Sequence, residues 1–324
     1  MAAPAWRQAL SREELDSLLE ISDLRGWLTI ALNWGIVWLA FWLVAAAPNP
    51  VTIVLALFLI GTRQLGMAIV MHEAAHRTMF RSRALNDRVG NWLAAYPVWA
   101  DVVPYRAYHL QHHAKTGSAE DPDLGLVTPF PITRESLRRK IWRDLSGQTG
   151  WKQFVAVLKR DLGLGSRGAR RNEPADEMAL SLSRGERRDA GWQKILPVAV
   201  TNAALLAILA LAGHAELYLL WVIAWFTTYR LVTRLRSIAE HAVTADDDDP
   251  LRNTRTTIAR PWERLFIAPN RVNYHLEHHL LMTVPHYNLP RMHRLLRDRG
   301  ALDGAEVAYG YWGVFQRASS RPSP

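Results

Sequence analysis

The chain alternates between long apolar runs and polar segments rich in arginine. Its four apolar runs fall at residues 27–47, 51–71, 195–212 and 217–233, paired by short turns at residues 48–50 and 213–216. An apolar helix of about 20 residues is long enough to cross a bilayer. The last two runs are short for independent spans but fit an antiparallel pair. The pattern predicts an all-α integral membrane protein with four transmembrane helices in two hairpins.

The polar segments are expected to lie outside the bilayer. Residues 1–26 are charged and helix-prone, with Ser11 followed by Glu14 as a capping box, which predicts a cytoplasmic N-terminal helix. Residues 72–194 and 234–324 would form a helical cap, which together with the spans makes one domain of residues 27–324.

Three segments of the cap carry more specific expectations. Residues 91–104 are apolar but too short to span, which favours a re-entrant or interfacial segment. Residues 135–162 are predicted to form surface helices on the lipid headgroups, with Trp142, Trp151 and Phe154 facing inward. Residues 163–191 resemble a connector, and the acidic run at 246–249 is interpreted as a solvated turn rather than a metal site.

The distribution of positive charge gives the orientation. Neither short turn contains Lys or Arg, whereas every long polar segment is rich in arginine, so the turns are expected outside and both termini inside. This asymmetry also accounts for a net charge of +9 without invoking nucleic acid.

The chain has no cysteine, which excludes disulfides, thiolate metal sites and iron–sulfur clusters. The same absence and the abundance of arginine favour a bacterial chain, and therefore the inner membrane.

Eight of the 12 histidines lie in three five-residue windows, HEAAH, HLQHH and HLEHH. Residues three or four apart share one face of a helix. Neutral imidazole binds zinc, copper, iron and nickel, and eight imidazoles are too many for one tetrahedral ion. The pattern predicts two metal ions at the cytoplasmic ends of the spans, held by His72, His76, His109, His112, His113, His275, His278 and His279.

The three windows resemble the histidine boxes of the membrane fatty acid desaturase and hydroxylase superfamily, and residues 280–287 resemble its acyl-lipid desaturase branch. The resemblance covers residues from about 27 to about 296. It implies a centre of two iron ions that uses molecular oxygen to attack an unactivated carbon–hydrogen bond, and hence a fatty acid desaturase. It also implies a ninth ligand, His241, with Glu240 as a carboxylate that could orient its imidazole.

Such a reaction requires two electrons, and the sequence contains no nucleotide-binding or haem-binding segment. A separate donor is therefore expected, such as a ferredoxin or a b-type cytochrome. The arginine-rich cytoplasmic face would attract an acidic carrier and also anionic membrane lipids. The expected substrate is a lipid acyl chain, and nucleic acid is not an expected partner.

Other functions fit parts of the pattern. A hydroxylase of fatty acids, sphingolipids or carotenoids would use the same ligands. HEAAH also matches an intramembrane zinc metalloprotease with Glu73 as general base, although six box histidines would then have no role. A metal transporter or sensor fits less well, because transporters place ligands near the bilayer midplane.

The remaining polar candidates near the boxes have simpler interpretations. Asp121 and Asp123 follow the second box, either as partners of a ligand or as a helix-ending turn. His286 is interpreted as a packing or orienting residue. His214, in an external turn, and His293, on a basic surface helix, are expected to take no part in the site.

Overall fold

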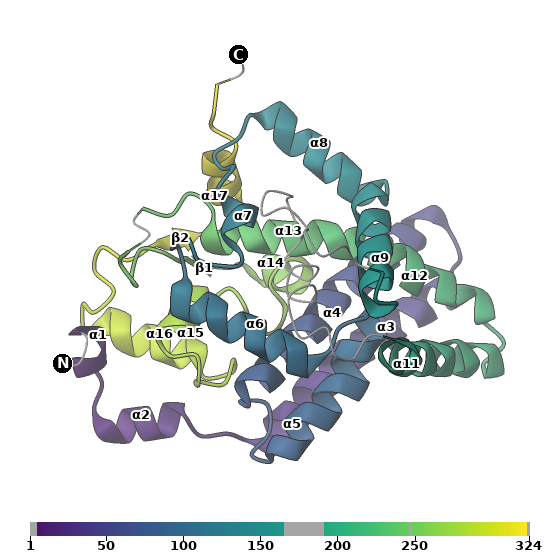
Figure 1. Cartoon of the computed structure of the whole chain (residues 1–324), viewed down its shortest axis with the longest axis horizontal. Helices are drawn as coiled ribbons and strands as arrows, with labels where there is room; N and C mark the ends of the chain where they lie inside the picture. The colour runs from purple at the N-terminus through teal and green to yellow at the C-terminus, as the bar shows by residue number, and fades with distance from the viewer. Residues whose placement is uncertain (1–4, 165–190, 246–247, 323–324) are drawn as a thin grey trace.

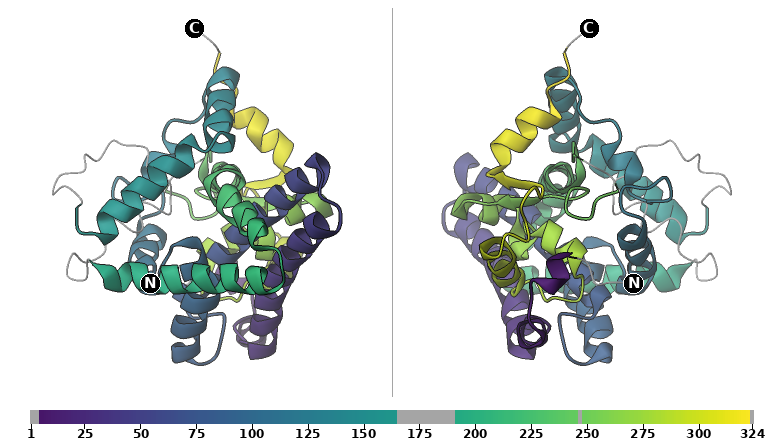
Figure 2. Two further views of the ribbon diagram at one scale, coloured as in Figure 1. Left: turned by 90° about the vertical axis from the view of Figure 1, so that its right-hand side faces the viewer. Right: turned by 90° about the vertical axis from the view of Figure 1, so that its left-hand side faces the viewer.

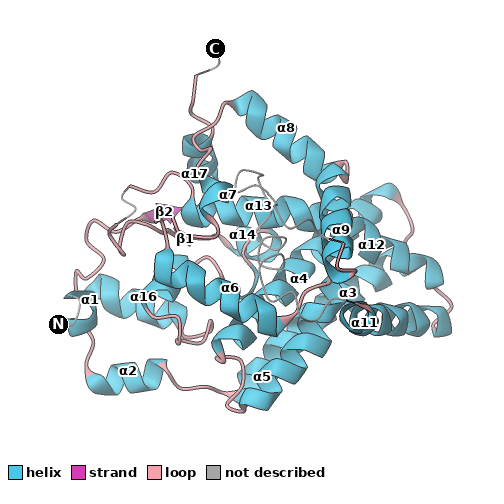
Figure 3. Cartoon of the chain, viewed as in Figure 1, coloured by secondary structure: helices cyan, strands magenta, loops and turns pink. Residues whose placement is uncertain are grey.

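The computed structural model describes residues 5–164, 191–245 and 248–322. The described chain is mostly helical (Figure 3), which confirms the predicted helical class. One feature was not predicted: two short strands, β1 (Thr256–Ile258) and β2 (Val307–Tyr309), pair in parallel. Most of the expected connector and the first part of the acidic run lie outside the described residues.

The N-terminal segment forms two short helices, α1 (Ala5–Gln8) and α2 (Arg12–Leu18), rather than one. The predicted capping box is confirmed. The Glu14 amide donates to the Ser11 hydroxyl at 3.1 Å, and the Ser11 amide donates to the Glu14 carboxylate at 2.9 Å. The first apolar helix begins at Asp23, earlier than expected, because Ser22 caps its N-terminus.

The first hairpin consists of α3 (Asp23–Ala46) and α4 (Pro50–His76). Asn49 caps α4 in the turn between them. As predicted, α4 continues beyond the apolar run without a break and carries His72 and His76 at its end. Arg63, a charge within the apolar run, is buried and donates to the carbonyl of Leu265 at 2.8 Å. This hydrogen bond inside the protein offsets part of the free-energy cost of placing a charge in an apolar environment.

The second hairpin consists of α11 (Trp192–Leu211), the 3₁₀ turn η4 (Ala215–Leu217) and α12 (Tyr218–Phe226). The amide oxygen of Asn202 accepts hydrogen bonds from Tyr218 and Trp221, which ties α11 to α12. The fourth predicted run does not form one helix, because the chain breaks at Thr227 (φ −122°, ψ −88°) before α13 (Thr228–His241) begins.

Three helices in the described part of the chain are long and apolar enough to cross a membrane, namely α3, α4 and α11. Together they support membrane association. The fourth predicted span falls on two shorter helices that meet at Thr227.

The remaining elements pack around these helices, and the C-terminal tail projects beside α8 and α17 (Figures 1 and 2). They are α5 (Arg83–Gly90), the π-helical turn η1 (Asn91–Ala95), the 3₁₀ turn η2 (Tyr96–Val98), α6 (Val102–Lys115), α7 (Leu124–Val127), α8 (Arg134–Leu145), α9 (Gln148–Asp161), α14 (Pro261–Phe266), the 3₁₀ turn η5 (Pro269–Arg271), α15 (His275–Leu280), α16 (Leu289–Asp298) and α17 (Tyr311–Ala318). Residues 91–104, expected to be re-entrant or interfacial, form η1, η2 and the start of α6.

The prediction that both tryptophans of residues 135–162 face inward is wrong. The exposed fractions of Trp142 and Trp151 are 67% and 59%, whereas Phe154 does pack inward. In α8 the buried residue is instead Asp144, whose carboxylate binds the guanidinium of Arg234 on α13. Residues two apart point to opposite sides of a helix, so the burial of Asp144 turns Trp142 outward.

Candidate metal centre

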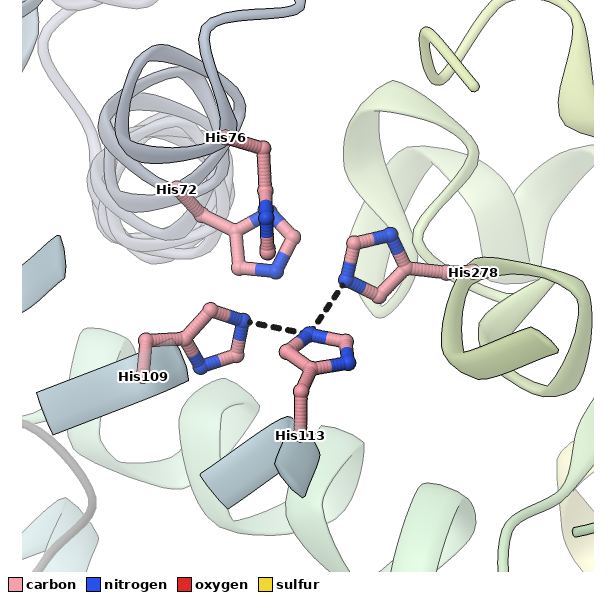
Figure 4. Close-up of side chains that lie close together, drawn as sticks. All are labelled: His72, His76, His109, His113 and His278. Carbon is pink, nitrogen blue, oxygen red and sulfur yellow. Dashed lines mark hydrogen bonds between the residues drawn. The ribbon is translucent and has the colours of Figure 1, made fainter. Parts of the chain in front are cut away.

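Five histidines from three helices form the first group of candidate ligands. The ligand atoms of all five lie within 4.8 Å of one another. Figure 4 shows their imidazoles converging from α4, which is seen end-on, from α6 and from α15. Spacing by four residues places both members of the α4 pair, and both of the α6 pair, on one helix face. The members are His72, His76, His109, His113 and His278.

Four histidines form a second group with the same closeness: His112, His241, His275 and His279. They come from α6, α13 and α15. The Nε2 atoms of His241 and His275 lie 2.8 Å apart, which brings the end of α13 against the start of α15. His241, the ligand suggested only by resemblance, therefore lies among the box histidines.

The two groups are neighbours because two of the boxes are divided between them. His112 and His113 differ by one residue, about 100° around a helix, so they point into different groups. The third box is divided in the same way between His278 and His279. The rings of His113 and His279, one from each group, stack with centroids 4.2 Å apart.

The structure thus brings together all nine histidines expected to bind metal. The other three histidines of the chain, His214, His286 and His293, belong to neither of these groups.

The donor set fits metal ions. Among the described residues, the Nε2 atoms of His76 and His279 are buried without a hydrogen-bond partner. A buried polar atom left unpaired costs about 1–3 kcal/mol. Packing this many imidazoles together would therefore be unfavourable unless a ligand binds their nitrogens. Metal ions held by several imidazoles each would satisfy these nitrogens.

Protonation does not compete with metal near neutral pH. Burial, and then the charges of neighbouring imidazoles, hold the pKa of His109, His275 and His278 well below the usual histidine value. The pKa values of His113, His241 and His279 are lowered for the same reason, burial first. The neutral imidazole is the form that binds metal.

Asp121 and Asp123 form a polar network around His112 rather than a plain helix-ending turn. The Nδ1 atom of His112 lies 2.8 Å from Oδ1 of Asp121, whose other oxygen accepts from the Gly117 amide at 3.0 Å. Tyr108 donates to Asp123. A carboxylate only accepts, so His112 donates from Nδ1 and turns the lone pair of Nε2 toward the second group.

Both carboxylate oxygens of Glu73 contact other groups of the protein, whereas a general base would need a free oxygen to accept a proton. Its carboxylate accepts from the Thr78 hydroxyl and from the His286 amide, each at 2.9 Å, and lies 3.3 Å from Nδ1 of His72. The side chain of His286 also reaches Thr29 on α3 at 3.1 Å. His286 is therefore a packing and orienting residue, and Glu73 supports His72, which does not favour the metalloprotease interpretation.

Two interactions near the site differ from expectation. Glu240, suggested as a partner of the adjacent His241, lies 3.5 Å from Nε2 of His275. His293 is buried rather than on the surface, and its Nδ1 lies 2.7 Å from Oε1 of Glu277. The sequence contains a signal for this burial, because His293 follows Leu289 by four residues and so shares its apolar helix face.

Comparisons with known proteins agree with this geometry. A family model described as "Fatty acid desaturase" matches residues 48–311. The chain is 26% identical to the dihydrorhizobitoxine desaturase of Bradyrhizobium elkanii, over 81% of this chain and 72% of the relative. It is 23% identical to the sn-1 oleoyl-lipid 12-desaturase of Synechocystis sp., with the same coverage of 81% and 72%. It is 25% identical to a beta-carotene ketolase of Paracoccus sp., over 77% of this chain and 83% of the relative.

The matched residues contain all nine histidines of the two groups, and the relatives are desaturases and a related oxygenase. The chain therefore belongs to the fatty acid desaturase family, as a membrane-associated oxidoreductase that is a desaturase or a related oxygenase.

Proposed function

We propose that the chain is a membrane-bound acyl-lipid desaturase whose nine histidines hold two iron ions. The observation that carries this proposal is the pair of adjacent histidine groups, which divide the nine residues five and four between two candidate metal positions. A metalloprotease would need one such position. Two interleaved groups in a fatty acid desaturase family member favour a two-iron centre.

The ligand set supports iron. Imidazole is a suitable ligand for iron, and the chain offers no thiolate, which would favour other metals. When bound, two iron ions would supply the activation of molecular oxygen that an unactivated carbon–hydrogen bond requires. The chain itself aims the imidazoles at two neighbouring points, and burial lowers the pKa of His109, His113, His241, His275, His278 and His279, which favours their neutral form. Asp121 fixes the orientation of His112, and Glu73 supports His72.

An apolar groove supports an acyl chain as the substrate. It has a volume of about 800 Å³, lies between α4, α13 and α14, and is lined by residues such as Val54, Phe58 and Leu235. Leu235 precedes His241 by six residues on α13, or about 9 Å along a helix axis. An alkyl chain in the groove would therefore lie along the helix that carries His241, a ligand candidate of the second group.

The overall reaction defines the partners. Forming a double bond removes two hydrogen atoms from the acyl chain. Two further electrons and two protons, supplied from outside, complete the reduction of one oxygen molecule to two waters. A separate donor, a ferredoxin or a b-type cytochrome, would supply the electrons. The exposed arginines of α8, such as Arg138, Arg139 and Arg143, would attract an acidic carrier. We place the site on the cytoplasmic side of a bacterial inner membrane.

Hydroxylation or ketone formation is the second candidate, because one relative is named a beta-carotene ketolase. The histidine ligands do not distinguish these reactions from desaturation. The position of the reacting carbon relative to the metal centre would decide between them.

Metal analysis of the purified protein and lipid profiling of cells that express it test the proposal together. We expect about two iron ions per chain and new double bonds in acyl lipids. Replacement of His112 or His278 by alanine should lower the iron content and remove the new lipid. His214→Ala is the matched control, because His214 lies in an exposed turn and pairs with Glu216.

The other outcomes are equally informative. Two irons with a hydroxylated or ketonic product would keep the metal site and change the reaction to that of a related oxygenase. One zinc ion per chain without any lipid change would overturn the proposal.

A further inference from the structure

A single strand connects two histidine-bearing segments that are distant in sequence. Strand β1 (Thr256–Ile258) lies between the C-terminal end of α13, which carries His241, and the start of α15, which carries His275. Arg255 immediately precedes this strand. Arg255 and Thr256 are among the most buried residues of the chain, with exposed fractions of 1% and 0%.

Arg255 holds the end of α13. Its guanidinium donates to the carbonyls of Ala239 at 3.1 Å, Ala242 at 3.0 Å and Val243 at 2.7 Å. Its backbone amide also donates to the carbonyl of Glu240 at 2.8 Å. The last carbonyls of a helix lack partners within the helix, so one buried side chain supplies the bonds that end α13 directly after His241.

Thr256 holds the start of α15. Its hydroxyl donates to the carboxylate of Glu277 at 2.5 Å and accepts from the amide of Leu276 at 3.2 Å. The second oxygen of Glu277 is bound by His293 of α16. Glu277 lies between two histidines of the third box but does not belong to either group of candidate ligands. Its contacts hold α15 in place and do not orient an imidazole of either group.

We propose that Arg255 and Thr256 are positioning residues that set the separation of His241 and His275, and thereby build the second metal position. The Nε2 atoms of this pair lie 2.8 Å apart, which is close enough for both nitrogens to bind the same ion. The first histidine group receives no member from α13, and its one member from α15 is His278. We call the hydrogen bonds of Arg255 and Thr256 to α13 and α15 the clamp. Loss of the clamp should therefore weaken the second position more than the first. The inference rests on the two-metal arrangement of the proposed function.

Neighbouring threonines provide matched controls. Thr254 and Thr257 are as buried as Thr256, but neither hydroxyl has a hydrogen-bond partner within the described chain. Replacement of threonine by valine at any of the three positions removes one hydroxyl and conserves the shape of the side chain. Only Thr256→Val removes bonds to α15.

The first experiment is hydrogen exchange on the metal-free full chain, because it does not depend on metal binding. The amide of Leu276 should exchange faster in Thr256→Val than in wild type, and Thr256→Ser, which keeps the hydroxyl, should restore its protection. Thr254→Val and Thr257→Val should match wild type. Unchanged exchange of Leu276 in Thr256→Val would overturn the proposal.

The second experiment is titration with Co²⁺ followed by its visible absorption. Wild type should bind two ions, and Thr256→Val should bind one with wild-type affinity and the other about 10–100-fold more weakly. Arg255→Lys should give the same unequal loss, because an ammonium cannot reproduce the guanidinium fork. Equal weakening of both ions in these variants would reduce the clamp to a general folding role and contradict the proposal.

The two experiments separate the clamp from the proposed function. If wild type binds fewer than two ions, the two-iron function fails. The exchange of Leu276 still decides whether Thr256 holds the third histidine box.

Discussion

Nδ1 of His112 lies 2.8 Å from Oδ1 of Asp121, nine residues later in the chain. Both side chains are buried, so this contact selects which imidazole nitrogen faces the second histidine group. A carboxylate behind a ligating histidine fixes its tautomer and raises its basicity. The relationship makes Asp121 part of the candidate metal centre, although Asp121 belongs to neither histidine group.

Asp121→Asn should therefore weaken metal binding. We expect a loss of about 10–100-fold in affinity at one of the two positions, measured by competition with a chelator. Glu120→Gln is the control, since Glu120 is exposed and adjacent in sequence. Equal affinities for the two variants would show that His112 needs no carboxylate.

The metal-free protein should lose stability as the pH falls below about 6.5. The pKa values of His109, His275 and His278 are lowered in the folded chain, chiefly by burial. Below the ordinary histidine pKa the unfolded chain thus binds more protons, and stability decreases as the pH falls. Each such imidazole contributes about 1.4 kcal/mol per pH unit in this range. Melting temperatures with a chelator at pH 7.5 and 5.5 test this, and equal values would contradict it.

Gly61→Ala should destabilise the packing of α4 against α13. An added Cβ would lie 2.7 Å from the backbone nitrogen of Tyr229 and closer still to the hydroxyl of Thr228. Backbone atoms cannot move aside easily, so we expect a loss of about 1–3 kcal/mol. Gly35→Ala in α3 is the matched control, because its Cβ would meet no described atom within 4 Å. Thermal melting in detergent should separate the two variants, and similar melting temperatures would refute the close approach.

Asp144→Asn should be strongly destabilising. Asp144 is fully buried and binds the guanidinium of Arg234 at 2.5 and 2.8 Å. Removing one partner of a buried ion pair costs about 3–5 kcal/mol, because the other charge loses its compensation. The exposed pair of Glu135 and Arg139 on the same helix provides the comparison, and Glu135→Gln should cost at most about 1 kcal/mol. Equal losses in a denaturation experiment would argue against the buried pair.

Much of the candidate site could be predicted from the sequence, because it depends on local spacing. His72 and His76 share a face of α4 as a direct result of helical geometry. The continuation of α4 beyond its apolar run and the capping box at Ser11 and Glu14 are equally local. Hydropathy alone did not predict that the last apolar run forms two helices. The break at Thr227 leaves the composition of that run apolar, so it gives no hydropathy signal.

The sequence by itself determined that the chain is helical, that it contains helices able to cross a membrane, and that its histidines are concentrated in three boxes. These properties follow from residue type and from short periodic spacing. Only the tertiary structure decided how the nine histidines divide into two groups, because the division joins α4, α6, α13 and α15. The choice of Glu277 as the partner of His293 and the clamp formed by Arg255 and Thr256 are likewise tertiary contacts between separate segments. Packing selects such pairs across the chain, and no local spacing encodes them.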